Sequence, residues 1–165
     1  MYEDKIVVRR ARAVDADKFI ALVKELARYE KLSPPGRQEV SRLKSDAFGR
    51  KRKFELLMAF SGTEAVAYAV YFMTYSTFLA KQTLYLEDIF VLPSCRRRGV
   101  GMNLFSRLVS TAAERGCGRM EWSVLRWNRI ALAFYRKLGA TELGEWTYYR
   151  LTADRFAALS EMKAR

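Results

Sequence analysis

The sequence contains no histidine, and this absence removes several kinds of catalytic site at once. A Ser-His-Asp triad and a Cys-His pair cannot be built, and a zinc site would have only two cysteines and carboxylates as ligands. Hydrolases and metalloenzymes of these types are therefore excluded, and we expect no metal. The two cysteines, Cys95 and Cys117, form no CxxC motif, so free thiols are favoured over a disulfide.

Long apolar runs are also missing. The longest uncharged apolar stretch, Ala65 to Met73, is far shorter than the roughly 20 residues that cross a bilayer. The chain opens with Met1-Tyr2-Glu3-Asp4, which does not fit the profile of a signal peptide. We therefore expect a cytosolic (cytoplasmic) protein without a membrane partner.

The sequence does contain enough apolar residues for one packed core. Half of its 165 residues are hydrophobic and 13% are aromatic, which excludes a disordered polymer. Because a domain holds about 150 residues, we expect residues 1–165 to form a single domain.

Positive charge predominates in this chain. Thirty lysines and arginines oppose 18 aspartates and glutamates, which gives a net charge of +12. Such an excess favours an anionic partner, either nucleic acid or a phosphate-bearing cofactor. Composition does not choose between these two.

The apolar pattern predicts an α/β (mixed α+β) protein, with a mixed sheet and helices on both of its faces. Apolar runs bounded by turn residues predict strands at residues 6–11, 54–60, 65–75, 83–91, 119–125 and 145–151. Helical spacing predicts helices at residues 15–30, 38–48, 103–116 and 128–138, and a short helix with Phe156, Leu159 and Met162. Asp15 is expected to cap the first of these helices.

A glycine-rich turn connects the strand at 83–91 to the helix that follows it. The turn reads Arg96-Arg97-Arg98-Gly99-Val100-Gly101-Met102. Its backbone N–H groups and the helix dipole favour phosphate at one spot, the glycines permit a close approach, and the arginines add attraction. P-loop and Rossmann motifs are absent, which disfavours ATP and NAD. A purely structural tight turn is the alternative.

Three motifs, taken in order, resemble the GNAT superfamily of acetyl-CoA-dependent N-acetyltransferases. They are Leu84-Tyr85-Leu86-Glu87-Asp88-Ile89-Phe90-Val91, then Arg96-x-x-Gly99-x-Gly101, then Trp127-Asn128 with Phe134-Tyr135 and Leu138-Gly139-Ala140. Within this family, the sequence resembles the diamine branch, which contains the spermidine/spermine and thialysine acetyltransferases. The resemblance spans nearly the whole chain.

The resemblance implies a GNAT fold, with a central mixed, mostly antiparallel sheet and splayed parallel strands. It also implies acetyl-CoA as cosubstrate and a homodimer. The pyrophosphate would bind the turn, and the pantetheine arm would pair with the strand end, where the amide of Phe90 or Val91 would polarise the thioester carbonyl. The implied cofactor-binding residues are Ile89, Phe90, Val91, Arg96, Arg97, Arg98, Gly99, Val100, Gly101, Met102, Asn128, Ala131 and Tyr135.

Two residues are candidates for catalytic proton transfer. An alkylammonium has a pKa of about 10.4, so a base helps to make the amine nucleophilic. Glu87 is the candidate base, because we expect partial burial at the end of an apolar strand to make its carboxylate more basic. Tyr135 matches the family's general acid, which returns a proton to the CoA thiolate. A surface carboxylate and a core aromatic are the respective alternatives.

A cationic amine needs local carboxylates in a protein this basic. The resemblance places six residues around the amine: Tyr29, Glu30, Glu87, Asp88, Trp122 and Glu145. The two aromatic residues would serve as walls and cation–π partners. Surface ion pairs are the alternative for Glu30 and Glu145.

Two positions depart from the family's pattern. Ser76 stands where the polyamine enzymes carry an aspartate, which weakens a preference for long polyamines. Arg129-Ile130 stand where related chains carry Glu-Pro, which leaves the contacts after Asn128 open.

The leading hypothesis is therefore an acetyltransferase that acts on a small primary amine. Acetylation of protein lysines or N-termini is an alternative, although the sequence has no dedicated peptide-binding signal. A basic nucleic-acid-binding protein on the same fold is another alternative. The charge supports it, but the full set of motif residues does not.

Overall fold

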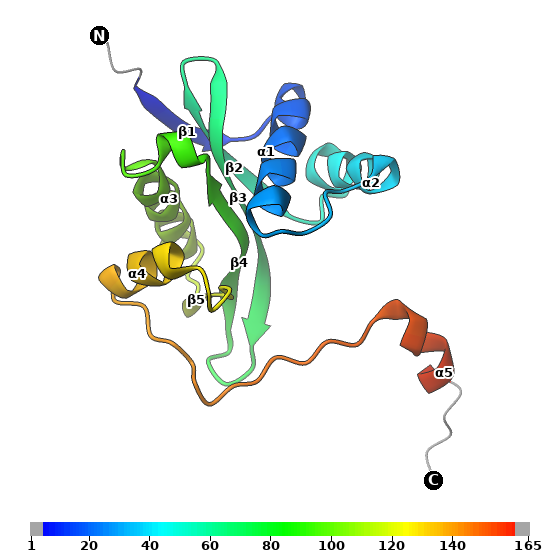
Figure 1. Cartoon of the computed structure of the whole chain (residues 1–165). Helices are drawn as coiled ribbons and strands as arrows, with labels where there is room; N and C mark the ends of the chain where they lie inside the picture. Colours follow the sequence, from blue (N-terminus) through cyan, green and yellow to red (C-terminus); the bar gives the residue numbers. More distant parts are fainter. Residues whose placement is uncertain (1–4, 161–165) are drawn as a thin grey trace. The chain divides into compact units, whose positions relative to one another are not determined.

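The computed structural model describes residues 5–160, and Figure 1 traces their helices and strands. Two compact units make up the chain, residues 1–123 and residues 124–165. The expectation of a single domain stays a prediction. The predicted last helix includes Met162, which lies outside the described residues. No helix within residues 5–160 is long and apolar enough to cross a membrane.

The first unit is built on a five-stranded sheet whose strands follow the order of the sequence. Its strands are β1 (Ile6–Arg10), β2 (Glu55–Ser61), β3 (Glu64–Ser76), β4 (Lys81–Val91) and β5 (Arg119–Trp122). The first four pair antiparallel, and β5 pairs parallel with β4. The predicted mixed, mostly antiparallel sheet is confirmed, although β5 ends at Trp122 rather than Leu125.

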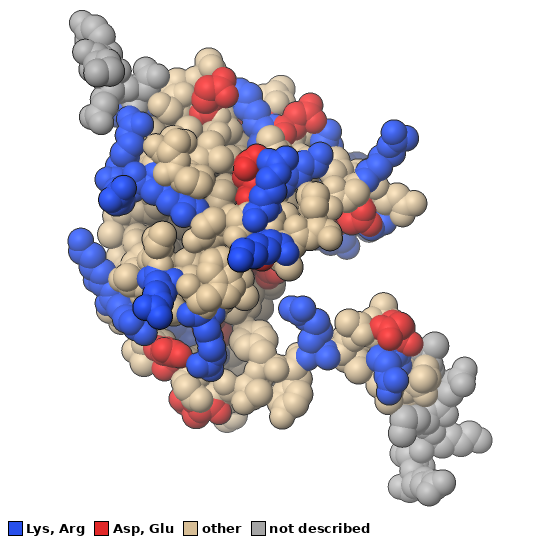
Figure 2. All heavy atoms as spheres, in the orientation of Figure 1, with Lys and Arg blue, Asp and Glu red and all other residues tan. Residues whose placement is uncertain are grey.

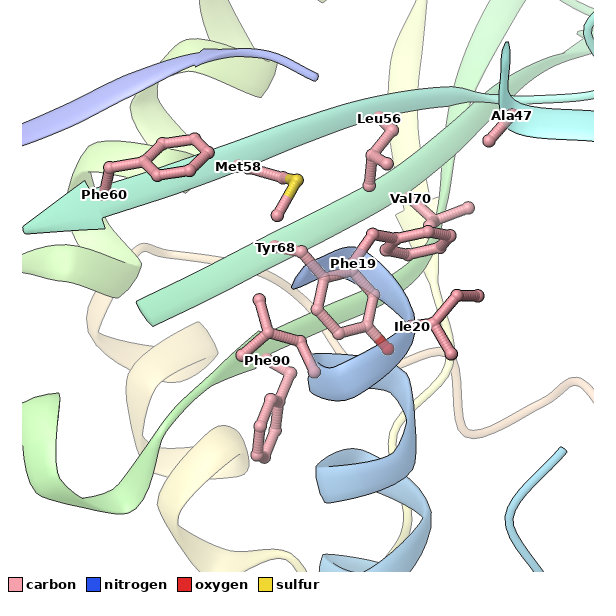
Figure 3. Packing of buried hydrophobic residues seen from close by; sticks show 10 residues of the cluster. Phe19, Ile20, Ala47, Leu56, Met58, Phe60, Tyr68, Val70 and Phe90 are labelled. Atoms are coloured by element: carbon pink, nitrogen blue, oxygen red, sulfur yellow. The ribbon is translucent and has the colours of Figure 1, made fainter. Parts of the chain in front are cut away.

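Helices cover both faces of this sheet (Figure 1). Helices α1 (Ala16–Tyr29) and α2 (Arg37–Phe48) lie on one face, and α3 (Val100–Glu114) lies on the other. Figure 3 shows the core beneath α1 and α2, which contains Phe19, Ile20, Leu22, Ala47, Leu56, Met58, Phe60, Tyr68, Val70 and Phe90.

Strand β2 is buried on both of its faces, which explains why its sequence is apolar at nearly every position. Leu56, Met58 and Phe60 belong to the core beneath α1 and α2. The intervening Leu57 and Ala59 are buried as well. Because successive side chains of a strand point to opposite faces, both faces of β2 are covered.

The second unit contains α4 (Arg129–Lys137) and α5 (Phe156–Ser160). Asn128 caps the start of α4, because its Oδ1 accepts a hydrogen bond from the amide of Ala131 at 3.2 Å. The predicted helix at 128–138 is thereby confirmed.

The predicted strand at 145–151 is wrong. Residues 146–152 belong to no helix or strand. Their apolar side chains lie in the open, with Trp146 70% and Tyr148 74% exposed. A strand is held by hydrogen bonds to a neighbouring strand, and within residues 5–160 this segment pairs with none.

Asp15 does not cap α1 as predicted, because its side chain makes no capping hydrogen bond to that helix. Its carboxylate instead accepts hydrogen bonds from Nη1 and Nη2 of Arg9 at 2.7 and 2.9 Å, and from the amide of Arg12 at 2.7 Å. The residue is buried. Chiefly because of the hydrogen bonds from Arg9, the pKa of Asp15 falls from 3.8 to about 2. This pair joins β1 to the start of α1.

Asp15→Asn is expected to lower the free energy of unfolding by about 2 kcal/mol at pH 7. Because folding lowers the pKa of Asp15, its stabilisation is complete above pH 3.8 and is lost as the pH falls through about 2. Urea unfolding of parent and variant at neutral and acid pH measures the effect. Asp17→Asn, at an exposed position of α1, is the control and should change stability little. An equal loss at both pH values would assign the effect to packing.

Candidate active site

A tight turn links the end of β4 to the start of α3. A single turn of 3₁₀ helix at Pro93–Cys95 follows β4, and α3 begins at Val100. Gly99 has a φ of 78°, which lies in the left-handed region that glycine adopts without strain. The first amides of α3 have no acceptor within the helix and carry the positive end of its dipole. The turn therefore offers hydrogen-bond donors to an anion.

Neither glycine of the turn is closely packed against the rest of the protein. A Cβ at Gly99 would meet no heavy atom within 4 Å, and a Cβ at Gly101 would meet Val91 Cγ2 at 3.7 Å. The side chains of Arg97 and Arg98 are exposed in the same turn. Packing within the protein therefore does not require glycine at position 101.

The end of β4 extends beyond β5. Pairing between these two strands covers residues 83–86 of β4 and stops at Trp122 of β5. On the other side, residues 88–91 remain paired with β3. Within residues 5–160, Ile89, Phe90 and Val91 therefore lie where one edge of β4 has no strand neighbour. An extended chain can pair with such an edge through main-chain hydrogen bonds.

A β-bulge at Glu87 changes the direction of side chains at the end of β4. Val70 of β3 lies opposite Asp88, and Tyr71 lies opposite Leu86, so Glu87 has no partner on β3. The extra residue reverses the alternation of faces and places Asp88 on the side of α1 with Val70. Glu87 itself is exposed. The expected burial of Glu87 is therefore wrong, because the bulge leaves its side chain in solvent.

Asp88, the next residue, is the half-buried carboxylate instead. The hydroxyl of Tyr68 donates a hydrogen bond to Asp88 Oδ2 at 3.4 Å. Burial, together with the negative charges of Glu87 and Glu30, raises the pKa of Asp88 to about 6. Burial also raises the pKa of Glu30. Asp88 therefore lies within electrostatic range of two other predicted carboxylates, Glu30 and Glu87, and at pH 7 it is mostly ionised.

Tyr68 is the residue of this site that the sequence analysis missed. Its side chain is fully buried in the core, yet its hydroxyl reaches Asp88. The available signal was a tyrosine within the apolar strand at 65–75, because a buried tyrosine hydroxyl normally has a polar partner.

Arg96 contacts residues of the protein itself. Its Nε donates a hydrogen bond to the carbonyl of Val91 at 3.0 Å, and its guanidinium carbon lies 4.5 Å from the centre of the Tyr29 ring. A cation of the chain therefore already lies over one of the two predicted aromatic walls. The other wall, Trp122, packs edge-on against Phe105 of α3, with ring centres 5.4 Å apart.

The second unit holds the remaining predicted residues. Tyr135 is buried on α4, and this burial raises its pKa to about 12. Its hydroxyl therefore keeps its proton at neutral pH. Asn128 and Ala131 form the cap of α4, and Glu145 is exposed.

Ser76 lies at the far end of the β3–β4 hairpin. It is buried, and its Oγ accepts a hydrogen bond from the amide of Leu79 at 3.3 Å. Its partner on β4 is Lys81, and the distance along a strand from position 81 to position 88 is roughly 23 Å. Within one chain, Ser76 therefore lies far from the carboxylates around Asp88. Its hydroxyl instead stabilises the turn between β3 and β4.

Both cysteines are free thiols, as predicted. Within residues 5–160, no three side chains of histidine, cysteine, aspartate or glutamate are arranged to hold a metal ion.

The open edge of β4, the turn before α3 and the carboxylates near Asp88 all lie in the first unit. Residues 20–140 match the acetyltransferase (GNAT) family, and the chain belongs to that family. Members of this family use acetyl-CoA.

Two relatives with named activities resemble most of this chain. It is 31% identical over 166 residues to thialysine N-epsilon-acetyltransferase of Bos taurus, covering 94% of this chain and 97% of the relative. It is 30% identical over 161 residues to spermidine/spermine N(1)-acetyltransferase-like protein 1 of Homo sapiens, covering 92% of this chain and 23% of the relative.

Two solved structures share the fold. An integron cassette protein from the mobile metagenome of V. cholerae matches with a TM-score of 0.83 at 23% identity, covering 95% of this chain and 98% of the other. An aminoglycoside N-acetyltransferase in complex with CoA matches with a TM-score of 0.74 at 21% identity, covering 89% of this chain and 95% of the other.

Proposed function

We propose that this acetyltransferase transfers acetyl from acetyl-CoA to the primary amine of a small diamine, polyamine or thialysine-like molecule. The observation that carries the proposal is the group of Glu30, Glu87 and Asp88 in a protein of net charge +12. A cationic acceptor needs negative charge locally, whereas an anionic cosubstrate benefits from the positive remainder. The names of the two relatives support the same class of amine.

Acetyl-CoA supplies an acetyl group that is activated as a thioester. In the proposal, main-chain amides from Arg97 to Met102 bind its pyrophosphate, and the open edge at Ile89, Phe90 and Val91 pairs with its pantetheine arm. The space beside Gly99 and Gly101 supports this assignment. From the second unit, Asn128, Ala131 and Tyr135 are proposed to contact the cosubstrate.

The proposed reaction is a direct attack of the amine. Asp88 and Glu30 attract the ammonium group, and Glu87, exposed at the bulge, accepts its proton directly or through water. The amine nitrogen then bonds to the acetyl carbon while the bond from that carbon to sulfur breaks. The second proton of the nitrogen passes through water to the departing sulfur, so that the products are the amide and the CoA thiol. Tyr135 provides the hydrogen-bonding proton to the sulfur as negative charge develops there.

The visible face of the molecule gives little support to nucleic-acid binding. Figure 2 shows lysine and arginine side chains distributed over the visible face, with acidic side chains among them. A nucleic-acid-binding surface is normally a concentrated basic patch or stripe. Acetylation of protein lysines remains the alternative that shares the same chemistry.

In the test, purified protein is mixed with acetyl-CoA and with spermidine, thialysine, lysine or a lysine-containing peptide. Release of the CoA thiol is measured. We expect kcat/KM for the best small amine to exceed that for the peptide by at least about tenfold, the effect of one charge-assisted contact. Preference for the peptide would favour protein acetylation. Duplex DNA binding without turnover of any amine would favour the nucleic-acid alternative.

The pH dependence of the same reaction tests the part of Asp88. Below the pKa of the amine, the fraction of free amine rises tenfold per pH unit, so log kcat/KM should rise with a slope of about one. Below pH 6 the slope should be steeper, because Asp88, with a pKa of about 6, must ionise as well. A slope of one throughout would remove Asp88 from amine binding.

A homodimer is also part of the proposal, and it rests on the resemblance to the diamine acetyltransferases.

A further inference from the structure

The three arginines of the turn differ in their surroundings. Arg97 and Arg98 are exposed, whereas Arg96 is half-buried. Arg96 Nε donates to the carbonyl of Val91 at 3.0 Å, and its guanidinium carbon lies 4.5 Å from the ring centre of Tyr29. Val91 is the last residue of β4, and Tyr29 is the last residue of α1. One cation therefore ties the end of this helix to the end of this strand.

The end of α1 carries a carboxylate of the proposed amine site. Glu30 follows Tyr29 directly, and Lys31 then turns the chain with a φ of 59°. Glu30 lies close enough to Asp88 to raise the pKa of that residue. Because Glu30 is the next residue, the position of Tyr29 constrains the main chain from which the Glu30 side chain extends.

A row of packed aromatic rings continues from Arg96 to Asp88. The guanidinium carbon of Arg96 is also 5.8 Å from the ring centre of Phe90. The ring centres of Tyr29 and Phe90 are 6.2 Å apart, and those of Phe90 and Tyr68 are 6.4 Å apart. Tyr68 then donates its hydrogen bond to Asp88. The separations lie in the range of aromatic contacts, so the row is continuous.

We propose that Arg96 is a positioning residue for the amine site and not a ligand of the phosphates. It holds Tyr29 against the end of β4, so that Glu30 is in place before the amine arrives. This inference rests on the proposed function, because it assigns Arg96 to the amine site of that reaction. Arginine suits the task, since its planar guanidinium can stack on a ring while Nε–H points at a carbonyl.

Loss of this contact should weaken amine binding more than the chemical step. The backbone hydrogen bonds at the end of α1, such as that from the amide of Glu30 to the carbonyl of Leu26 at 2.9 Å, do not involve Arg96. Without Arg96, the side chains of Tyr29 and Glu30 lose a fixed contact and are positioned only when the amine binds, which raises KM for the amine. The steps after binding use the Glu87 carboxylate as base and the Tyr135 hydroxyl as hydrogen-bond donor, so kcat should change less. A phosphate ligand would instead change the affinity for acetyl-CoA.

The experiment compares Arg96→Met with Arg97→Met, an exposed arginine of the same turn. Arg96→Met should raise the amine KM about tenfold, with the acetyl-CoA Kd within about twofold of the parent by calorimetry. Arg97→Met should do the reverse, because its charge faces the proposed phosphate site through solvent. Circular dichroism establishes that both variants are folded.

Substitutions of Tyr29 add a test that keeps Arg96 in place. Tyr29→Leu should raise the amine KM as Arg96→Met does, and Tyr29→Phe, which keeps the ring, should recover most of that loss. The double variant Arg96→Met/Tyr29→Leu should show less than the product of the two effects, because both remove the same contact.

Two results would overturn this assignment of Arg96. One is an unchanged amine KM in folded Arg96→Met, and the other is a loss of acetyl-CoA affinity as large as that of Arg97→Met. A parent protein that acetylates none of the amines overturns the proposed function and this inference with it. The parent and the variants are measured separately, so the two failures are distinguishable.

Discussion

Gly101→Glu is expected to weaken acetyl-CoA binding by about fivefold to a thousandfold while the protein stays folded. The change places a negative charge in the first turn of α3, where the proposed pyrophosphate site lies. Two like charges about 4 Å apart repel by roughly 1 to 4 kcal/mol in wet to partly dry surroundings. The fold should tolerate the substitution, because a Cβ there meets Val91 Cγ2 at an ordinary 3.7 Å. Calorimetric titration with acetyl-CoA measures the loss.

Two control variants separate charge, bulk and location. Gly101→Ala adds a methyl group that the protein itself accommodates, so its effect on Kd reports how closely the ligand approaches the main chain. Val109→Glu adds the same charge to a 46% exposed position of α3 and should leave Kd within about twofold, because salt screens distant charges. Parent-like affinity in folded Gly101→Glu would place the phosphates elsewhere.

Most of the first unit could be predicted from local sequence. The uninterrupted apolar residues of 54–60 indicated a strand covered on both faces, and Leu56 to Phe60 are all buried. The glycine-rich turn was also readable, because the left-handed conformation at Gly99 requires a residue without Cβ. Both features depend on short-range pattern and backbone sterics.

The arrangement of the carboxylates could not be predicted in the same way. The bulge at Glu87 arises from the pairing of β4 with β3, and no residue type near Glu87 in the sequence indicates it. The sequence analysis therefore predicted partial burial for Glu87, whereas the residue with this burial is Asp88. The contact of Arg96 with Tyr29 joins residues that are far apart in the chain, so the motif alone pointed Arg96 toward phosphate.

The prediction of a strand at 145–151 was wrong for a related reason. Its residues have the β-branched and aromatic character of a strand, but strand formation requires a partner edge. Within residues 5–160, this segment is paired with no strand. Propensity describes what a segment can form, and pairing decides what it does form.

Tyr135→Phe is expected to lower kcat about a hundredfold, the usual effect of removing one donor to developing negative charge. The ring stays in place, so the buried packing of α4 and the acetyl-CoA Kd should change little. Burial raises the pKa of Tyr135 to about 12, which makes the phenol a weaker acid than a thiol of pKa about 8.5. Tyr135 should therefore act mainly as a hydrogen-bond donor to the sulfur rather than by complete proton transfer.

The alkaline pH range distinguishes this role from that of an ordinary titrating acid. Because the pKa of Tyr135 is about 12, its proton stays bound up to pH 10, and kcat of the parent should show no decline between pH 8 and 10. The ratio of parent to Tyr135→Phe turnover should accordingly stay constant across that range. Tyr149→Phe, which removes a hydroxyl from a 93% exposed ring of the same unit, is the matched control and should keep the turnover of the parent. If Tyr135→Phe turns over as fast as Tyr149→Phe, the hydroxyl of Tyr135 takes no part in the reaction and the residue serves only the packing of α4.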